Sequence, residues 1–182
     1  MKLNLGAGND IRENYVNHDL VDLKGIDLVH DLNNYPWPMD DNSFDEVIAN
    51  DLLEHLDDFM KAMEESHRIL KPGGIFKIRV PYWNSWCTHA DPTHRRGFHE
   101  LRFHFFDPNS PYCIERPYYT SARFNIKSEI FVLAPLSPYF SIPFLRIVKI
   151  KNSFFKKIIG LIGNSISNVI IDLEMEIEKV SK

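Results

Sequence analysis

Four short apolar segments in the first fifty residues run into glycine, aspartate or asparagine, and this repeated ending constrains the fold more than any other feature. The first, KLNL at 2–5, leads into Gly6-Ala7-Gly8, and further segments follow at 15–20, 26–32 and 44–50. Their lengths are typical of strands bounded by turn residues. Strands this short and this closely spaced predict one sheet whose polar residues gather where the strands end.

Residues 52–70 change to a helical period, with apolar residues recurring on one face. Asp51 is expected to cap this helix, with Glu54 three residues on as in a capping box. Lys71-Pro72-Gly73-Gly74 is expected to end it, before a fifth strand at 75–80. The order strand, loop, strand, helix, strand predicts an α/β sheet that is mostly parallel.

The second half of the chain is less regular. Residues 81–122 are rich in Pro, His, Arg and aromatic residues without a sustained period, and a loop of this length inside a domain is usually functional. Regular alternation returns at 123–133, which we expect to be a strand. Residues 169–178 alternate apolar and acidic residues, which predicts a last strand with one face in water. A length of 182 residues suits one domain, 1–182.

Composition narrows the setting. Hydrophobic residues make up 44% and charged residues 25%, which is ordinary for a globular protein. Cys87 and Cys113 form no CxxC pair, so we expect neither a disulfide framework nor a cysteine zinc site. The N-terminal sequence lacks the pattern of a signal peptide, and no apolar run approaches a membrane span, so we expect a cytoplasmic protein.

Charge is uneven along the chain. Residues 1–65 contain four Lys and Arg against sixteen Asp and Glu, a net charge of −12, whereas the remaining residues are net positive. An acidic surface repels phosphate backbones, so we expect no nucleic-acid partner. It suits a ligand with cationic character or several hydroxyls, although a solvated acidic face would have the same composition.

The strand ends carry the first candidate site. In open parallel sheets, ligands bind beyond the carboxyl ends of the strands, where glycine lets the backbone approach a ligand. The repeats His18-Asp19-Leu20 and His30-Asp31-Leu32 place one aspartate at each of two strand ends, where a carboxylate can accept hydrogen bonds from a ribose diol or an amino group. The full GxGxxG fingerprint is absent, and a simple turn after each strand would explain the same residues.

Further motifs follow in a fixed order: DNSFDEVIA at 41–49, LEHL at 53–56 and RILKPGG at 68–74. Together with the glycine loop and the acidic strand ends, they resemble the class I S-adenosylmethionine-dependent methyltransferases, in the branch often called type 11. The resemblance covers about residues 1–81. It implies a Rossmann-like sheet, mostly parallel with the last strand antiparallel, and S-adenosyl-L-methionine as the cofactor.

The resemblance also implies roles for individual residues. Gly6, Ala7 and Gly8 would line the methionine part of the cofactor, and Asp19 would accept from the ribose hydroxyls. Asp31 and Leu32 would contact the adenine. Asn50 would face the sulfonium end, and His55 of the "EH" step would support the site structurally.

The chain departs from the family at one point. Only about six residues separate Gly8 from the second strand, so the helix that usually follows the glycine loop is short or missing. The cofactor would then be more exposed, or covered by a later segment or a partner chain. This departure favours an alternative function, a non-catalytic methyltransferase-fold domain that binds a nucleoside ligand or a partner chain.

The sequence THADPTHRRGFHELRFHFFDP at 88–108 holds four histidines at five-residue intervals. In the family, the region after the fifth strand faces the methyl acceptor, so we expect 82–122 to be an acceptor-side insertion or lid. Histidine titrates near neutrality, and we expect His94, Asp91 and His89 to take part in catalysis. Trp83, Trp86 and Tyr82 would stack on the acceptor, and Arg95 and Arg96 would hold an anion.

A metal is the rival interpretation of the same stretch. The spacing His89-x-Asp91-x-x-His94 would make the chain a His/Asp metalloenzyme. Five-residue steps do not align four histidines on one helix face, and no HExxH motif is present. We therefore expect no metal at these residues. The remaining alternative to catalysis is that the histidines only hold the loop together through hydrogen bonds. His99 and His104 lie among phenylalanines and are expected to pack.

Residues 142–163 combine apolar and basic side chains. They are expected to cover the sheet, with Ile147, Val148, Ile158, Ile159 and Ile162 in the core. The alternative is peripheral contact with an anionic membrane. The whole chain is thus expected to be a methyltransferase acting on a small polar or glycan-type acceptor, with a hydroxyl as the methylated group.

Overall fold

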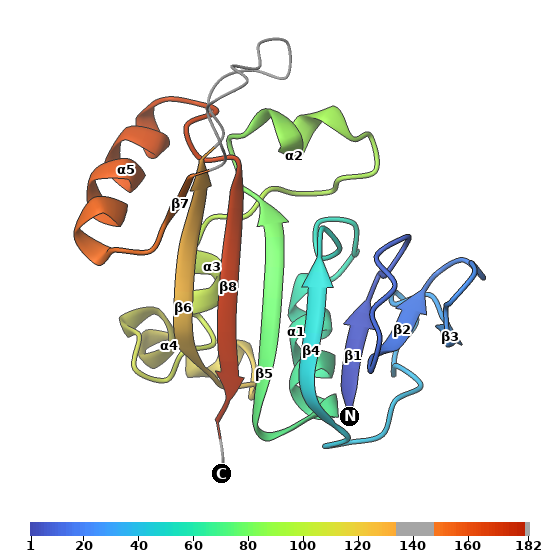
Figure 1. Cartoon of the computed structure of the whole chain (residues 1–182). Coiled ribbons are helices and arrows are strands. Elements are labelled where there is room, and N and C mark those ends of the chain that lie inside the picture. The colour runs from blue at the N-terminus through green and yellow to red at the C-terminus, as the bar shows by residue number, and fades with distance from the viewer. Residues whose placement is uncertain (134–147, 181–182) are drawn as a thin grey trace.

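A computed structural model describes residues 1–133 and 148–180 (Figure 1). In this part of the chain, eight strands form one sheet in the order β3-β2-β1-β4-β5-β8-β6-β7. Their bounds are β1 Lys2–Leu5, β2 Val16–Asp19, β3 Leu28–Val29, β4 Phe44–Asn50, β5 Leu70–Pro81, β6 Phe124–Leu133, β7 Val148–Ile150 and β8 Asp172–Lys179.

The first five strands are parallel, as the sequence predicted. β1 pairs with β2 on one side and with β4 on the other. The chain therefore adds strands outward from β1 first in one direction, to β3, and then in the opposite direction, to β4 and β5. Strand ends diverge at such a reversal, which is where α/β sheets bind ligands. Leu3 and Leu5 of β1 are completely buried and pack with Val47 and Ala49 of β4, so the core lies directly beneath these strand ends.

The remaining strands are antiparallel. β8 lies between β5 and β6 and runs opposite to both, which confirms an antiparallel last strand, and the short β7 adds a strand that the sequence did not predict. Leu173, Met175 and Ile177 of β8 are buried, whereas the intervening glutamates are partly exposed. The alternation along 169–178 therefore does mark a strand with one wet face.

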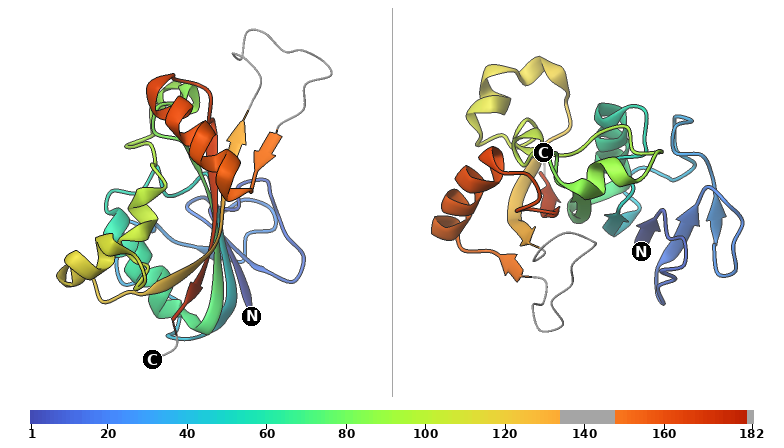
Figure 2. Two further views of the ribbon diagram at one scale, coloured as in Figure 1. Left: turned by 90° about the vertical axis from the view of Figure 1, so that its left-hand side faces the viewer. Right: turned by 90° about the horizontal axis from the view of Figure 1, so that it is seen from above.

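The helices lie on one face of the sheet. Figure 2 shows α1, α3, α4 and α5 on the same side, and within the described ranges no helix covers the other face. The chain between β1 and β2 contains turns without a helix, as its length predicted. Ion pairs line the uncovered face, among them Lys77 with Glu46 and Lys149 with Glu174, so that face remains polar. The helices are α1 Phe59–Ile69, α2 Trp86–Ala90, α3 Leu101–His104, α4 Pro111–Glu115 and α5 Ser153–Ser165, with a 3₁₀ turn at Pro117–Tyr119.

The predicted start of the first helix was wrong. α1 begins at Phe59, and Asp58 caps it by accepting a hydrogen bond from Lys61 N at 3.1 Å. Asp51 cannot be the cap, because its φ of 50° places it in a left-handed turn directly after β4. Leu53 and Leu56 matched the helical period because both are buried, but they are buried in the loop at 51–57. The end of α1 at Ile69 agrees with the predicted stop.

Four phenylalanines attach the segment 82–122 to the rest of the domain. The ring of Phe59 at the start of α1 makes edge-to-face contacts with Phe98, Phe103 and Phe106, at centroid distances of 5.3, 5.7 and 5.8 Å. All three partners are essentially unexposed. Aromatic pairs of this geometry contribute about 0.5–1.5 kcal/mol each beyond their burial. The segment is thus packed against the start of α1 rather than left as a free loop.

The prediction for 142–163 was partly wrong. Residues 142–147 lie outside the described residues. α5 packs through Gly160 and Gly163, whose Cα positions face Phe131 and Ile170. Val148, Ile158 and Ile162, expected in the core, are 46%, 42% and 39% exposed, whereas Ile159 packs against the core. Of the helices that the structure describes, none is long and apolar enough to cross a membrane.

Candidate functional site

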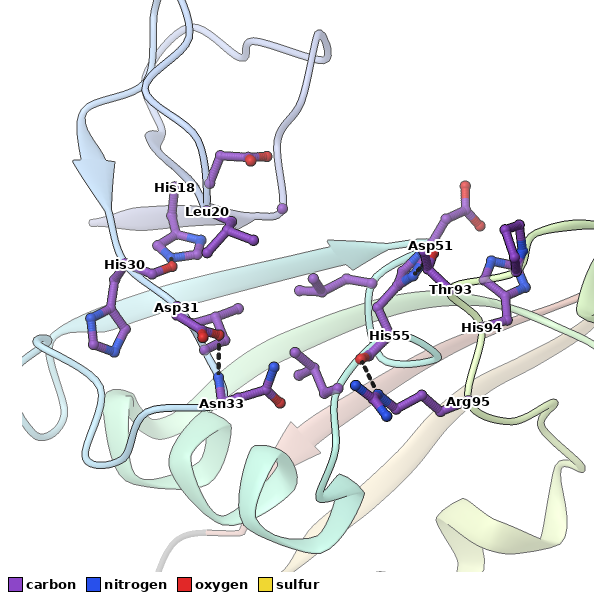
Figure 3. Close-up of a pocket in the computed structure, with 16 residues that line it drawn as sticks. His18, Leu20, His30, Asp31, Asn33, Asp51, His55, Thr93, His94 and Arg95 are labelled. Carbon is purple, nitrogen blue, oxygen red and sulfur yellow. Dashed lines mark hydrogen bonds between the residues drawn. The ribbon is translucent and has the colours of Figure 1, made fainter.

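A cavity of about 900 Å³ opens at the carboxyl ends of the parallel strands. Figure 3 shows its labelled residues in two groups: one follows β2 and β3, and the other comes from the loop after β4 and from the segment 82–122. A volume of this size suits a nucleotide-sized ligand. The lining residues are Gly6, His18, Asp19, Leu20, His30, Asp31, Leu32, Asn33, Asp51, Leu52, His55, Leu56, Pro92, Thr93, His94 and Arg95.

The glycine loop begins in a conformation that other residues adopt reluctantly. Gly6 has a φ of 62°, and a Cβ on it would lie 2.9 Å from Leu52 Cδ1. Gly8 also has a positive φ, of 50°, but open space around it. The backbone can therefore turn sharply at the end of β1 and leave the wall of the cavity free of side-chain atoms.

Asp19 at the end of β2 is tied to this loop. Its carboxylate accepts hydrogen bonds from Gly8 N at 2.8 Å and from Val21 N at 3.1 Å. Each carboxylate oxygen has two lone pairs, so one acceptor position per oxygen remains. Asp19 can thus hold the loop and still accept two hydroxyl hydrogen bonds from a ligand.

His18, which the sequence analysis gave no role, is a buried polar group at the cavity wall. Its Nε2 lies 3.0 Å from His30 O, and its Nδ1 is buried without a hydrogen-bond partner. Burial lowers the pKa of His18, which favours the neutral form of the ring. With Nε2–H donated to the carbonyl, Nδ1 is an unused acceptor, and a ligand donor in the cavity would satisfy it.

The end of β3 contributes a polar edge. Asp31 Oδ1 accepts from Asn33 N at 2.9 Å, and Leu32 is almost completely buried with its carbonyl bonded to Trp37 Nε1. Asn33 in turn accepts from Asp57 N at 2.8 Å. These bonds fix the edge so that the second Asp31 oxygen and the Leu32 side chain line the cavity.

The loop after β4 carries a group of acids. Asp51 pairs with Arg79 of β5, and Glu54 is completely buried with both carboxylate oxygens lacking a hydrogen-bond partner. Burial, reinforced by the nearby charges of Asp51 and Asp172, raises the pKa of Glu54 to about 8. Burial and the charge of Asp51 likewise raise the pKa of Asp172 to about 6. A cation placed among these groups would be strongly stabilised.

The segment 82–122 closes this side of the cavity. Arg95 N donates to Glu54 O at 2.8 Å, and the Arg95 guanidinium pairs with Asp57 at 2.7 Å. Arg96 donates to Asp57 O at 2.8 Å. Both arginines are therefore used to attach the segment to the loop after β4, whereas the sequence analysis expected them to hold an anionic acceptor.

A hydrogen-bond chain runs from Asp91 to the cavity edge. Asp91 Oδ1 accepts from Thr93 N and Thr93 Oγ1, at 2.8 and 2.6 Å, and these bonds hold the pKa of Asp91 below its usual value. Thr93 Oγ1 lies 3.0 Å from His55 Nδ1. The ring of His55 meets that of His94 edge to face, with centroids 4.7 Å apart. Burial, then the proximity of His94, lowers the pKa of His55.

The cavity brings together Gly6, Asp19, Asp31, Leu32 and His94 of the predicted site residues. Others lie elsewhere. Asn50 lines a second hollow on the uncovered face of the sheet, together with Arg79, its neighbour on β5. His89 lies in a third hollow with Trp83 and Trp86. Asp91 does not line the cavity and is connected to it through its hydrogen bonds with Thr93. Ala7 and Gly8 are not among the residues that line the cavity either. Tyr82, expected to stack on an acceptor, is completely buried in the core.

Glu54 is the residue whose place the sequence analysis most misjudged, because the helical period led to its interpretation as part of a capping box. His55 was expected to support the site structurally, and it lines the cavity. The signal that could have located them was the pair itself, because a carboxylate and an imidazole next to each other after a strand end are candidate ligands or acid–base groups. Their meeting with His94, 39 positions later, has no local sequence signal.

Comparison with known proteins agrees with this architecture. Residues 5–78 match the family described as "Methyltransferase domain". A demethylmenaquinone methyltransferase from Staphylococcus epidermidis is 42% identical over 73 residues, which is 38% of this chain and 30% of that protein. The chain thus spans less than a third of the length of this curated relative.

Solved structures share the fold over nearly the whole chain. An S-adenosylmethionine-dependent methyltransferase from Thermotoga maritima superposes with a TM-score of 0.63 at 13% identity, covering 98% of this chain and 81% of that one. One from Archaeoglobus fulgidus gives 0.60 at 16% identity, covering 98% and 85%. Residues 5–78 thus match a methyltransferase family in sequence, and the chain shares the fold of solved S-adenosylmethionine-dependent methyltransferases.

Proposed function

We propose that the protein transfers a methyl group from S-adenosyl-L-methionine to a small polar or glycan-type acceptor. The observation that carries the proposal is the cavity of about 900 Å³ at the reversal of strand order, with acceptor groups at two successive strand ends. Bound there, the cofactor supplies a methyl carbon on a positively charged sulfur. The carbon–sulfur bond would break as the acceptor bonds to that carbon, and a hydroxyl acceptor would pass its proton to a nearby base, for which His94 is the candidate.

The residues present fit this cofactor. Asp19 offers one free lone pair on each carboxylate oxygen for the two ribose hydroxyls, and Asp31 an oxygen for the adenine amino group. Leu20, Leu32, Leu52 and Leu56 give the cavity apolar surface for the flat base. The acids around Asp51 complement a cationic sulfonium.

The segment 82–122 supplies the acceptor side in this proposal. Pro92, Thr93, His94 and Arg95 line the cavity opposite the ends of β2 and β3 (Figure 3). His94 is the residue nearest the acceptor in this proposal, and Asp91 orients the neighbouring His55 through Thr93. His89 belongs to the neighbouring hollow with Trp83 and Trp86. We do not propose demethylmenaquinone, the acceptor in the name of the Staphylococcus epidermidis relative, for this protein, because the similarity to that relative covers 38% of the chain.

Calorimetric titration of the purified protein with S-adenosylhomocysteine tests the proposal, with NAD as the control ligand. We expect saturable binding of S-adenosylhomocysteine with one site per chain and no heat from NAD. Binding should also raise the unfolding temperature in proportion to RT ln(1 + [L]/Kd). Failure to bind S-adenosylhomocysteine would favour a domain that keeps the fold without the methyl-transfer reaction.

The outer face of α5 supports peripheral contact with an anionic membrane as part of the same proposal. Phe154, Phe155 and Leu161 are 66%, 56% and 73% exposed, and the stretch 151–166 contains three lysines and no acid. An apolar helix face flanked by basic residues binds at the surface of anionic bilayers.

Vesicle co-sedimentation checks this contact. The protein should pellet with vesicles that contain about a third phosphatidylglycerol and remain in solution with pure phosphatidylcholine, because each basic residue near an anionic surface contributes about 1 kcal/mol. The double variant Phe154→Ser, Leu161→Ser should abolish pelleting. Tyr118→Ser, which changes an exposed aromatic residue outside α5, should not. Equal pelleting with both lipids would contradict the proposal.

A further inference from the structure

Three potential ligands meet at the edge of the cavity. One ring nitrogen each of His55 and His94 and a carboxylate oxygen of Glu54 all lie within 4.8 Å of one another. His94 Nε2 and Glu54 Oε1 are 3.9 Å apart, which is too far for a hydrogen bond. Neither Glu54 oxygen has any hydrogen-bond partner, although the side chain has no exposed surface. A buried carboxyl group without a hydrogen-bond partner is costly, and a bound cation would remove that cost.

The outer hydrogen bonds of the two histidines leave their lone pairs available. Thr93 has one hydroxyl proton, and its 2.6 Å contact with Asp91 uses it, so Thr93 accepts from His55 Nδ1–H. His94 Nδ1 lies 3.3 Å from the carbonyl of Thr88, which can only accept. In both rings the proton is therefore on Nδ1, and Nε2 carries the lone pair. This is how histidines that bind metals are held by their surroundings.

Two imidazole nitrogens and a carboxyl oxygen that lie within 4.8 Å of one another can bind a cation together. Asp51 and Asp172 add negative charge beside Glu54, and among the described residues Arg79 is the guanidinium that pairs with Asp51. A zinc ion bound at 2.0–2.2 Å would need its ligand atoms about 3.4 Å apart, so the side chains would have to close by little more than 1 Å.

We propose that Glu54, His55 and His94 bind one divalent transition-metal ion, with Zn²⁺ as the best match. Two imidazoles and one carboxylate are a ligand set used by zinc sites that keep a coordination position open. The remaining position would lie at the cavity edge, where His55 and His94 are lining residues. It would take an oxygen of the acceptor, which favours hydroxyl-bearing acceptors.

The metal site rests on these side chains alone, and its role toward the acceptor rests on the proposed methyl transfer. The test is calorimetric titration of the chelator-treated, full chain with Zn²⁺, together with elemental analysis after gel filtration. Wild type should retain one zinc per chain. Glu54→Gln and His94→Gln, both close in size to the original side chains, should each weaken zinc binding by more than ~10-fold.

His89→Gln is the matched control, because His89 is an exposed histidine of the same segment outside the three ligands. It should bind zinc as wild type does. The proposal is overturned if wild type shows no saturable binding, or if Glu54→Gln and His94→Gln, both folded by circular dichroism, bind zinc like wild type. It is also overturned if His89→Gln loses the metal, since the zinc would then be adventitious.

The same wild-type preparation is titrated with S-adenosylhomocysteine, so that the two proposals fail separately. Binding of S-adenosylhomocysteine without zinc would remove the metal and leave the cofactor site, with His94 Nε2 free to act as a general base. Zinc binding without S-adenosylhomocysteine would support the metal site and contradict methyl transfer.

Discussion

Replacement of Asp19 by alanine should weaken binding of S-adenosylhomocysteine by roughly 100-fold, because two hydrogen bonds to a charged acceptor are lost at about 1.5 kcal/mol each. The carboxylate is held in place by hydrogen bonds from Gly8 N and Val21 N, so ligand binding loses less side-chain entropy at Asp19. Isothermal titration calorimetry on wild type and variant measures the change.

Two companion variants separate ligand binding from the shape of the loop. Asp19→Asn keeps one carbonyl oxygen and the size of the side chain, so its loss should be intermediate. Asp22→Ala removes an exposed aspartate three residues later and should leave the Kd within about twofold of wild type, as expected for a surface residue. If Asp19→Ala bound S-adenosylhomocysteine as tightly as wild type, Asp19 would serve only to close the turn after β2.

Replacement of Phe59 by alanine should lower the free energy of unfolding by about 3–5 kcal/mol, the usual range for a buried phenylalanine. Phe59 is 7% exposed and its ring contacts three other phenylalanines, all in the segment that crosses the strand ends. The variant therefore loses burial and at the same time loosens the connection between α1 and residues 98–106. Urea denaturation followed by tryptophan fluorescence measures the loss.

The matched control is Phe154→Ala on α5, whose side chain is 66% exposed. It should change the free energy of unfolding by no more than about 0.5 kcal/mol. A Phe59→Ala loss below 1 kcal/mol would show that the four rings do not form a tightly packed cluster. S-adenosylhomocysteine binding should also weaken in folded Phe59→Ala, since residues 92–95 lose part of their support.

Much of the fold was readable because it depends on local pattern. The strands at 44–50 and 123–133 coincide with β4 and β6 or nearly so, and the last strand was recognised from alternation that continues for most of β8. Whether a strand is buried on one face or on both decides which of its positions are apolar. The period and length of the apolar pattern therefore reveal the strand. The resemblance to methyltransferases added the order of elements.

The start of α1 shows where local pattern misleads. Leu53 and Leu56 are buried and fall at helical spacing with later residues, but burial alone does not decide whether the backbone is helical. The left-handed conformation of Asp51 ends β4 in a turn, and Asp58 rather than Asp51 became the cap. Similarly, Asn50 was expected to face the cofactor, but it lines the hollow on the uncovered face of the sheet, which its position at a strand end does not reveal.

By itself the sequence determined an α/β sheet, the glycine turn, the aspartates at the ends of β2 and β3, and the missing helix after the glycine loop, because each depends on residues close together in the chain. Only the tertiary structure decided that His94 meets Glu54 and His55, and that His89 does not. That meeting depends on a segment 39 positions away being fixed over the strand ends by a cluster of phenylalanines. No periodicity records such a contact, since its free energy comes from packing between distant parts of the chain.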